Sequence, residues 1–248
     1  NVLGEVGRGH VIAFNILNIG RYKLGIGCVG AAKRALQLAA EYANERKQFN
    51  VPIASFRAIQ EKIGTMATEL YAQESALYRT GGLFEENMSK LTAEEQENGG
   101  KVAAAIAEYA VECSLNKFAA SEMLDYVADE AVQIYGGYGF MSEYEVESIY
   151  RDSRINRIFE GTNEINRLLV PGTILKKALK GELPLLQKAQ SLQEELMMMM
   201  PEEPGDAPLE QEKYLLHNMK KVFLMVAGTG AQKYETALEK EQELLLKV

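Results

Sequence analysis

Three long stretches of the sequence carry apolar residues at every third or fourth position, which is the period of an α-helix. They run from about Val11 to Ala40, from Phe56 to Leu77 and from Ile106 to Ile134. No segment of useful length alternates apolar and polar residues as a half-buried strand does. The sequence therefore predicts an all-α fold, an up-down helical bundle in which polar connections join the long helices.

Local signals predict where these helices end. Pro52 lacks an N–H donor and pushes the preceding residue out of the helical region, which predicts a loop. A polar, Glu-rich stretch over 81–100 predicts a hairpin between the second and third helices. The glycine cluster at 136–139 stops the third helix. Two shorter helices are expected after it, one with Ser142 as N-cap and one from about 162 to 180.

The composition changes after residue 180. Half of the six prolines lie in 201–208, which is typical of a linker. We therefore expect a helical-bundle domain over 1–180, a linker over 181–208 and the start of an additional C-terminal helical domain over 209–248. In the last part, 209–227 and 231–248 each have the pattern of an amphipathic helix. The Gly-rich residues at the start of the chain predict a connector from an upstream segment, so that the chain is a fragment.

The charge and cysteine content exclude several classes of function. A net charge of -8 leaves no basic stripe for a phosphate backbone, so nucleic acid is not expected as a partner. Cys28 and Cys113 lack metal-ligand spacing, and neither a metal site nor a disulfide framework is expected. No apolar run approaches the roughly 18 residues of a membrane span.

Three motifs carry the chemical information. They are Glu45-Arg46-Lys47-Gln48-Phe49, the segment Gln133 to Phe140, and the segment Arg151 to Ile165 with Phe159-Glu160-Gly161-Thr162 at its centre. In this order and at these separations they are similar to the C-terminal domain of FAD-dependent acyl-CoA dehydrogenases. The resemblance covers about residues 1–180, and the longer tail resembles the very-long-chain branch of the family.

The resemblance implies an activity for the parent protein. Such an enzyme oxidises acyl-CoA to trans-2-enoyl-CoA in fatty-acid β-oxidation, with FAD as cofactor and electron-transferring flavoprotein as electron acceptor. It forms a homodimer or a dimer of dimers, located in the bacterial cytoplasm or the mitochondrial matrix, or peripherally at a membrane. The N-terminal helical domain and middle β-domain of a complete member have no counterpart here, so the chain alone should be inactive. An acyl-CoA oxidase, or a non-enzymatic helical assembly module, is the alternative.

Glu160 matches the family's catalytic base. The α-proton of an acyl thioester is weakly acidic, and a desolvated Glu with a raised pKa can accept it. Gly161 would leave room for the thioester, and Ile158 and Phe159 would supply apolar surroundings. The alternative is that Glu160 merely precedes a helix with Thr162 as its N-cap.

The resemblance also implies residues that bind the cofactor. Arg46 would reach across the dimer interface to the FAD pyrophosphate of the partner subunit, because a guanidinium can donate two parallel hydrogen bonds to a diphosphate. The alternative is an exposed loop arginine. The other candidates are Gln48 and Phe49 beside Arg46, Gln133, Gly136 and Gly137 near the adenine, and Thr162 and Glu164 near the ribityl and phosphate region.

Two further residues match the acyl-CoA-contacting part of the first helix. They are Asn18 and Arg21, which could equally be solvated. The same stretch has a weak echo in the tail, because a shift of two hundred residues aligns Asn18 with Asn218 and Gly30 with Gly230. A degenerate second copy of the helical domain is one hypothesis, and chance similarity between amphipathic helices is the other.

Overall fold

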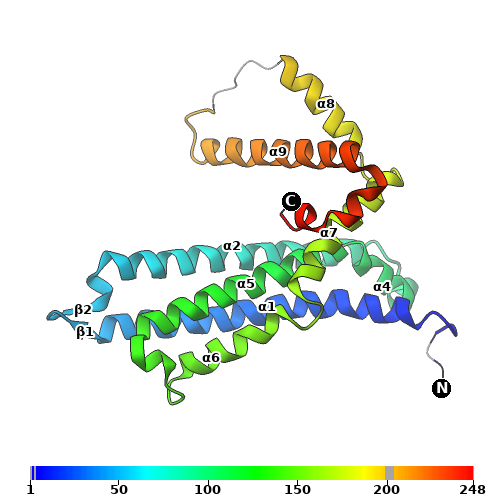
Figure 1. Cartoon of the computed structure of the whole chain (residues 1–248). Coiled ribbons are helices and arrows are strands. Elements are labelled where there is room, and N and C mark those ends of the chain that lie inside the picture. The colour runs from blue at the N-terminus through cyan, green and yellow to red at the C-terminus, as the bar shows by residue number, and fades with distance from the viewer. Residues whose placement is uncertain (1, 3, 199–203, 248) are drawn as a thin grey trace. The chain divides into compact units, whose positions relative to one another are not determined.

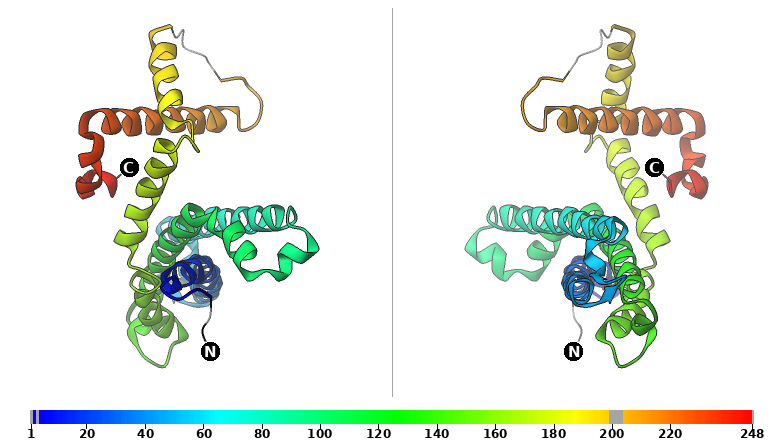
Figure 2. Two further views of the ribbon diagram at one scale, coloured as in Figure 1. Left: turned by 90° about the vertical axis from the view of Figure 1, so that its right-hand side faces the viewer. Right: turned by 90° about the vertical axis from the view of Figure 1, so that its left-hand side faces the viewer.

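The computed structural model describes residues 2, 4–198 and 204–247 (Figure 1). The chain divides into two compact units, Asn1–Asn166 and Arg167–Val248. The first unit is built on α1 (Gly9–Glu45), α2 (Arg57–Met88) and α5 (Ala110–Tyr135), which lie alongside one another and alternate in direction (Figures 1 and 2). The predicted all-α bundle is confirmed.

Small side chains allow α1 and α5 to pack closely, and this is the most extensive helix contact of the first unit. The small buried residues of α1 recur at helical spacing and include Cys28, Ala32, Ala35, Ala39 and Ala43. Gly25 belongs to the same seam, because a Cβ on it would lie 3.3 Å from the Asn116 carbonyl oxygen of α5. Packing against a neighbour thus offsets the low helix propensity of glycine in α1. Larger apolar side chains from α2 and α5, among them Met66 and Leu124, fill the rest of the core.

The connection after α1 is a short hairpin within the predicted loop. Strands β1 (Lys47–Gln48) and β2 (Val51–Pro52) pair antiparallel. Phe49 and Asn50 join them with φ of 52° and 67°. Two successive left-handed residues give the type I′ geometry that suits a two-residue hairpin loop.

The predicted hairpin over 81–100 is wrong in its first part. α2 continues to Met88, and Gly81 remains helical because it lies against α1, where a Cβ would meet the Tyr22 hydroxyl at 2.6 Å. Two short helices follow, α3 (Ala93–Glu97) and α4 (Gly99–Ala107), the first opened by a capping box between Thr92 and Glu95.

The segment after α5 differs from the prediction in where its short helix begins. The 3-10 helix Gly136–Phe140 leads into α6 (Glu145–Ser153), whose N-cap is Tyr144 and not the predicted Ser142. The ring of Tyr144 stacks on Tyr138 with centroids 5.3 Å apart, so aromatic packing fixes this end. The 3-10 helix Arg154–Arg157 and α7 (Asn163–Leu179) follow, and α7 continues into the second unit.

The second unit contains α8 (Leu185–Met198), α9 (Glu210–Tyr234), the 3-10 helix Glu235–Lys240 and α10 (Gln242–Leu245). The expected linker over 181–208 thus includes a helix, because α8 packs on α9. The expected break after 227 is also wrong. Gly228 and Gly230 stay inside α9, and a Cβ on Gly228 would lie 2.7 Å from the Ala189 Cβ of α8. The domain division stays a prediction.

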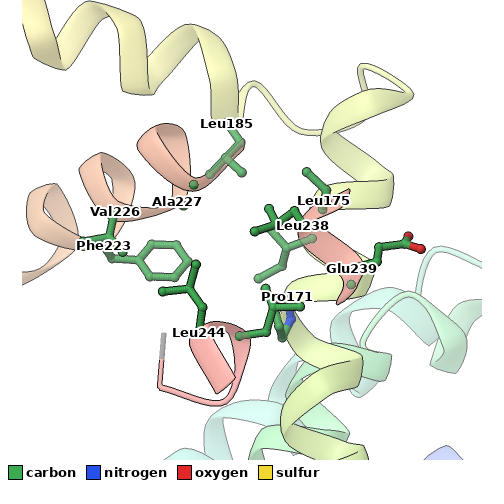
Figure 3. A pocket seen from close by; sticks show the side chains of 13 residues that line it. Pro171, Leu175, Leu185, Phe223, Val226, Ala227, Leu238, Glu239 and Leu244 are labelled. Atoms are coloured by element: carbon green, nitrogen blue, oxygen red, sulfur yellow. The ribbon is translucent and has the colours of Figure 1, made fainter. Parts of the chain in front are cut away.

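A small apolar cavity of about 60 Å³ lies inside this second unit, and Figure 3 shows the side chains that line it. Side chains of α7, α8 and α9 line it together with those of the C-terminal turns, and they include Pro171, Leu175, Leu185, Phe223 and Leu244. Glu239 is the charged residue at its edge. Among the described residues, no helix is long and apolar enough to cross a membrane.

Candidate active site

The candidate base lies in a left-handed turn between α6 and α7. Glu160 has a φ of 57° and Gly161 a φ of 83°. Glycine adopts such values freely, whereas a glutamate there costs of order 1–3 kcal/mol and persists only where its surroundings hold it. We call residues 160–162 the Glu160 turn.

The carboxylate of Glu160 lies directly over the backbone of α1. A Cβ on Gly20 would be 2.5 Å from Glu160 Oε2 and 2.8 Å from its Cδ. Only a residue without a side chain leaves this space to the carboxylate. The glycine at position 20 is therefore part of the site, a role that the sequence reasoning did not assign. Glu160 itself is partly buried, and the neighbouring Ile158 and Phe159 are about half exposed on this chain.

Buried side chains hold the backbone of the Glu160 turn. Arg21 Nε donates to the Glu160 carbonyl oxygen at 3.2 Å. Asn166, which is fully buried, donates from Nδ2 to the carbonyl oxygens of Gly161 at 2.8 Å and Thr162 at 3.0 Å. Lys117 Nζ donates to the Gly161 oxygen at 2.7 Å. The turn is thus fixed from α1, α5 and α7 together.

Asn18 and Arg21 are buried, each with 6% exposure, so the alternative that they are solvated is wrong. Arg21 Nη1 donates a long hydrogen bond of 3.4 Å to Asn18 Oδ1. Burial lowers the pKa of the Arg21 guanidinium, while the nearby Cys113 and Glu160 act in the opposite direction. Arg21 contacts the Glu160 turn directly, and Asn18 lies beside Arg21 on the same helix.

Lys117 of α5 is a residue of this site that sequence reasoning missed. Its side chain is fully buried, and its Nζ donates also to Asn163 Oδ1 at 2.6 Å. Burial lowers the pKa of the Lys117 ammonium from 10.5 to about 8. A signal for it exists in the sequence, because Lys117 lies four residues after Cys113 and three before Ala120, on the apolar stripe of its helix.

Thr162 and Glu164 open helix α7. The Ile165 N–H lies 3.4 Å from Thr162 Oγ1, so Thr162 is placed as the N-cap that the alternative interpretation of this segment predicts. The pKa of the Glu164 carboxyl is lowered because its own backbone N–H and the Thr162 hydroxyl donate to it. The segment is therefore a helix N-terminus as well as the neighbour of Glu160.

A second cluster forms where the end of α1 meets the end of α5. Arg46, Gln48, Gly136 and Gly137 line one hollow of about 580 Å³ together with tyrosines 42, 135 and 138. The Arg46 guanidinium carbon lies 5.9 Å from the centre of the Tyr138 ring. The structure thus brings together two motifs that are far apart in the sequence.

The remaining candidates of this cluster lie beside the hollow. Phe49 is 86% exposed in its left-handed conformation, and Gln133 is an exposed residue in the last turn of α5. Arg46 follows Arg21 by 25 residues along α1, which corresponds to about 37 Å at 1.5 Å per residue. The candidate residues therefore form two separate clusters.

The described residues contain no group of three His, Cys, Asp or Glu side chains that could hold a metal ion.

Residues 7–175 match a family model described as "Acyl-CoA dehydrogenase, C-terminal domain". The chain belongs to the acyl-CoA dehydrogenase family. This confirms the family that the three motifs indicated. Residues 218–248 match a second family model with the same description, and this region contains the tail residues of the weak sequence echo, Asn218 and Gly230 among them.

Similar acyl-CoA dehydrogenases are found in bacteria and mammals. A "Probable acyl-CoA dehydrogenase" of Bacillus subtilis is 68% identical over all of this chain and 42% of its own length. The crystal structure of an acyl-CoA dehydrogenase complexed with FAD from Bacillus anthracis is 70% identical, with a TM-score of 0.98 over 99% of this chain and 42% of that one. The mitochondrial very long-chain specific enzyme of Rattus norvegicus is 41% identical over 68% of this chain and 23% of its own length. This acyl-CoA dehydrogenase chain thus spans less than half the length of these relatives.

We expect the stability of the full-length protein to depend on pH through Lys117. Because its pKa is about 8 in the folded state and ordinarily 10.5, the unfolded chain binds more protons between these values. The free energy of unfolding of the wild type should therefore rise, relative to Lys117→Met, by up to ~3 kcal/mol as the pH rises through this window. Below about pH 7 the difference should be constant. Thermal midpoints of both proteins at several pH values measure this, and parallel curves over the whole range would contradict it.

Proposed function

We propose that the full-length protein carrying this chain is an FAD-dependent dehydrogenase that oxidises acyl-CoA to trans-2-enoyl-CoA in fatty-acid β-oxidation, with Glu160 as the base. The observation that carries the proposal is the Glu160 turn. The Glu160 carboxylate is held over Gly20 of α1 by a strained backbone conformation. Buried side chains, among them Arg21 and Lys117, fix this conformation. Strain of this kind concentrates at functional sites.

The chemistry divides between the chain and the cofactor. Glu160 accepts the α-proton of the thioester through a carboxylate oxygen. A bound FAD would supply the acceptor for the hydride that leaves the β-carbon, while the electron pair of the α-C–H bond would form the C=C double bond. Arg21 keeps the carboxylate in place by holding the Glu160 carbonyl oxygen, and Gly20 provides the space for it. In our proposal Asn18 and Arg21, which flank Gly20, contact the acyl-CoA, and Gly161 leaves room for the thioester.

The second cluster fits the diphosphate and adenine end of FAD. Arg46 offers a planar cation that can donate two hydrogen bonds to a diphosphate, and Gly136 and Gly137 let the backbone approach a ligand closely. Gln48 lies in the same hollow. Phe49 and Gln133 would contact the cofactor from the rim. Thr162 and Glu164 would lie near the ribityl and phosphate region of the flavin that Glu160 serves.

The separation of the two clusters supports a homo-oligomer. About 37 Å of helix lies between Arg21 and Arg46, which is longer than an extended dinucleotide. In one subunit the Arg46 hollow and the Glu160 turn would therefore serve two different FAD molecules. We propose a homodimer or a dimer of dimers, in which Arg46 binds the FAD of the partner subunit, and electron-transferring flavoprotein as the acceptor of the electrons.

The base is tested by Glu160→Gln in the full-length flavoprotein. The amide is nearly isosteric but cannot accept the proton, so FAD content and acyl-CoA affinity should be preserved. The rate constant of flavin reduction should fall by about two to four orders of magnitude. Anaerobic single-turnover bleaching of the flavin by acyl-CoA measures it. Glu69→Gln, which changes an exposed carboxylate on α2, should match the wild type. A Glu160→Gln rate within about threefold of the wild type would place the base elsewhere.

The cofactor contact is tested by Arg46→Ala. Removal of the guanidinium should lower FAD occupancy of the purified protein, and activity should recover at least partly when excess FAD is supplied, because the flavin chemistry is unchanged. The ratio of flavin to protein absorbance and the activity with and without added FAD measure this. Arg79→Ala, at an exposed position on α2, serves as the control. Full FAD occupancy in Arg46→Ala would show that Arg46 does not bind the diphosphate.

A further inference from the structure

Lys117 is unusual because its amino group is buried inside the first unit. Among the described residues it is the largest fully buried side chain. It lies on the same face of α5 as Cys113, Ala120 and Leu124. An ammonium group is costly to bury unless hydrogen bonds compensate it. The lowered pKa of Lys117 reflects this cost. A lysine at the surface would avoid this cost of burial, so we asked which group the buried ammonium of Lys117 stabilises.

The two acceptors of Lys117 lie on the C-terminal side of the candidate base. The Gly161 carbonyl at 2.7 Å belongs to the residue immediately after Glu160, and Asn163, whose Oδ1 is at 2.6 Å, is the first residue of α7. Neither of these two acceptors is a carboxylate, although the carboxylates of Glu164 and Glu122 are close enough to favour the charged ammonium. Lys117 therefore joins the end of the Glu160 turn to the start of the next helix.

Asn163 is itself held in orientation. Its Nδ2 donates to Ser121 Oγ at 3.0 Å and to Glu122 Oε1 at 3.1 Å, and these two acceptors follow Lys117 by about one helical turn. Because the amide donates to α5 through its nitrogen, its oxygen is directed to Lys117. Lys117, Ser121 and Asn163 thus form one buried polar group that ties the Glu160 turn to α5.

We propose that Lys117 is a positioning residue for Glu160. It holds the Gly161 carbonyl and the Asn163 amide, and so keeps Glu160 left-handed with its carboxylate over Gly20. The inference rests on the proposed role of Glu160 as the base. A glutamate at positive φ relaxes unless several contacts fix it. Arg21 holds the carbonyl of Glu160, and Lys117 holds the carbonyl of Gly161. If Lys117 is removed, the Gly161 carbonyl keeps its hydrogen bond from Asn166 but loses the one from the buried ammonium.

Lys117→Met in the full-length flavoprotein tests the proposal, because it keeps the length of the side chain and removes the donor. We expect the rate constant of flavin reduction to fall about 10- to 100-fold, since a displacement of about 1 Å at a reacting group costs up to this much. FAD content and affinity for acyl-CoA should stay within about threefold of the wild type. Lys33→Met, on the exposed side of α1, should leave all three unchanged.

A double-mutant cycle separates positioning from general damage. If Lys117 acts through Glu160, Lys117→Met should cause no further loss of rate in a Glu160→Gln protein. Additive losses would show a merely structural role and overturn the proposal. A rate constant of Lys117→Met within twofold of the wild type would also overturn the proposal. The same holds if the rate falls only in proportion to the FAD content. If Glu160→Gln alone keeps the wild-type rate, the proposed function fails as well.

A milder variant decides the matter if Lys117→Met does not fold. Ser121→Ala removes one acceptor of the Asn163 amide and leaves Lys117 in place. It should lower the rate constant of flavin reduction about threefold or more, with FAD content unchanged and no further effect in the Glu160→Gln background. An unchanged rate in Ser121→Ala would overturn the proposal.

Discussion

The candidate site depends on hydrogen bonds from two buried cations to two consecutive carbonyl groups. Arg21 of α1 donates to the carbonyl of Glu160, and Lys117 of α5 donates to the carbonyl of Gly161. In a low-dielectric interior such bonds are stronger than at the surface, and unpaired groups are costly. The arrangement can therefore compensate the strain of a left-handed glutamate.

The close packing of α1 against α5 sets the distance between these two donors. Gly25 and the buried alanines of α1 let the helices approach, with Gly20 and Arg21 in the preceding turns. A larger side chain in this seam would force the helices apart. The small residues thus connect the packing of the bundle with the geometry of the Glu160 turn.

The sequence predicted the long helices well because apolar residues recur at helical spacing in each of them. It did not predict where α2 ends or that α8 forms, because tertiary contacts determine the structure of both segments. Gly81 is kept helical beside Tyr22, and Ala189 and Leu192 of α8 are buried although the composition nearby is typical of a linker. Local propensity contains no information on such contacts.

The motifs identified the family and the candidate base, but not the residues that hold the base. Arg21 and its acceptor are 139 residues apart in sequence, and no local pattern relates them. Lys117 lies on a predicted apolar stripe, yet a lysine is normally a surface residue. The space over Gly20 is likewise visible only once the Glu160 turn is folded against α1.

The central claim is that the Glu160 carboxylate works from its place over Gly20. It is tested most directly by flavin reduction in Gly20→Ala, compared with Gly27→Ala, where an added Cβ meets nothing within 4 Å on the same helix. Both changes replace a helical glycine by alanine, so intrinsic helix propensity is matched. We predict that Gly20→Ala, whose methyl group displaces the carboxylate, lowers the single-turnover rate at least about 10-fold, while Gly27→Ala stays within about twofold. Equal rates in the two variants would contradict it.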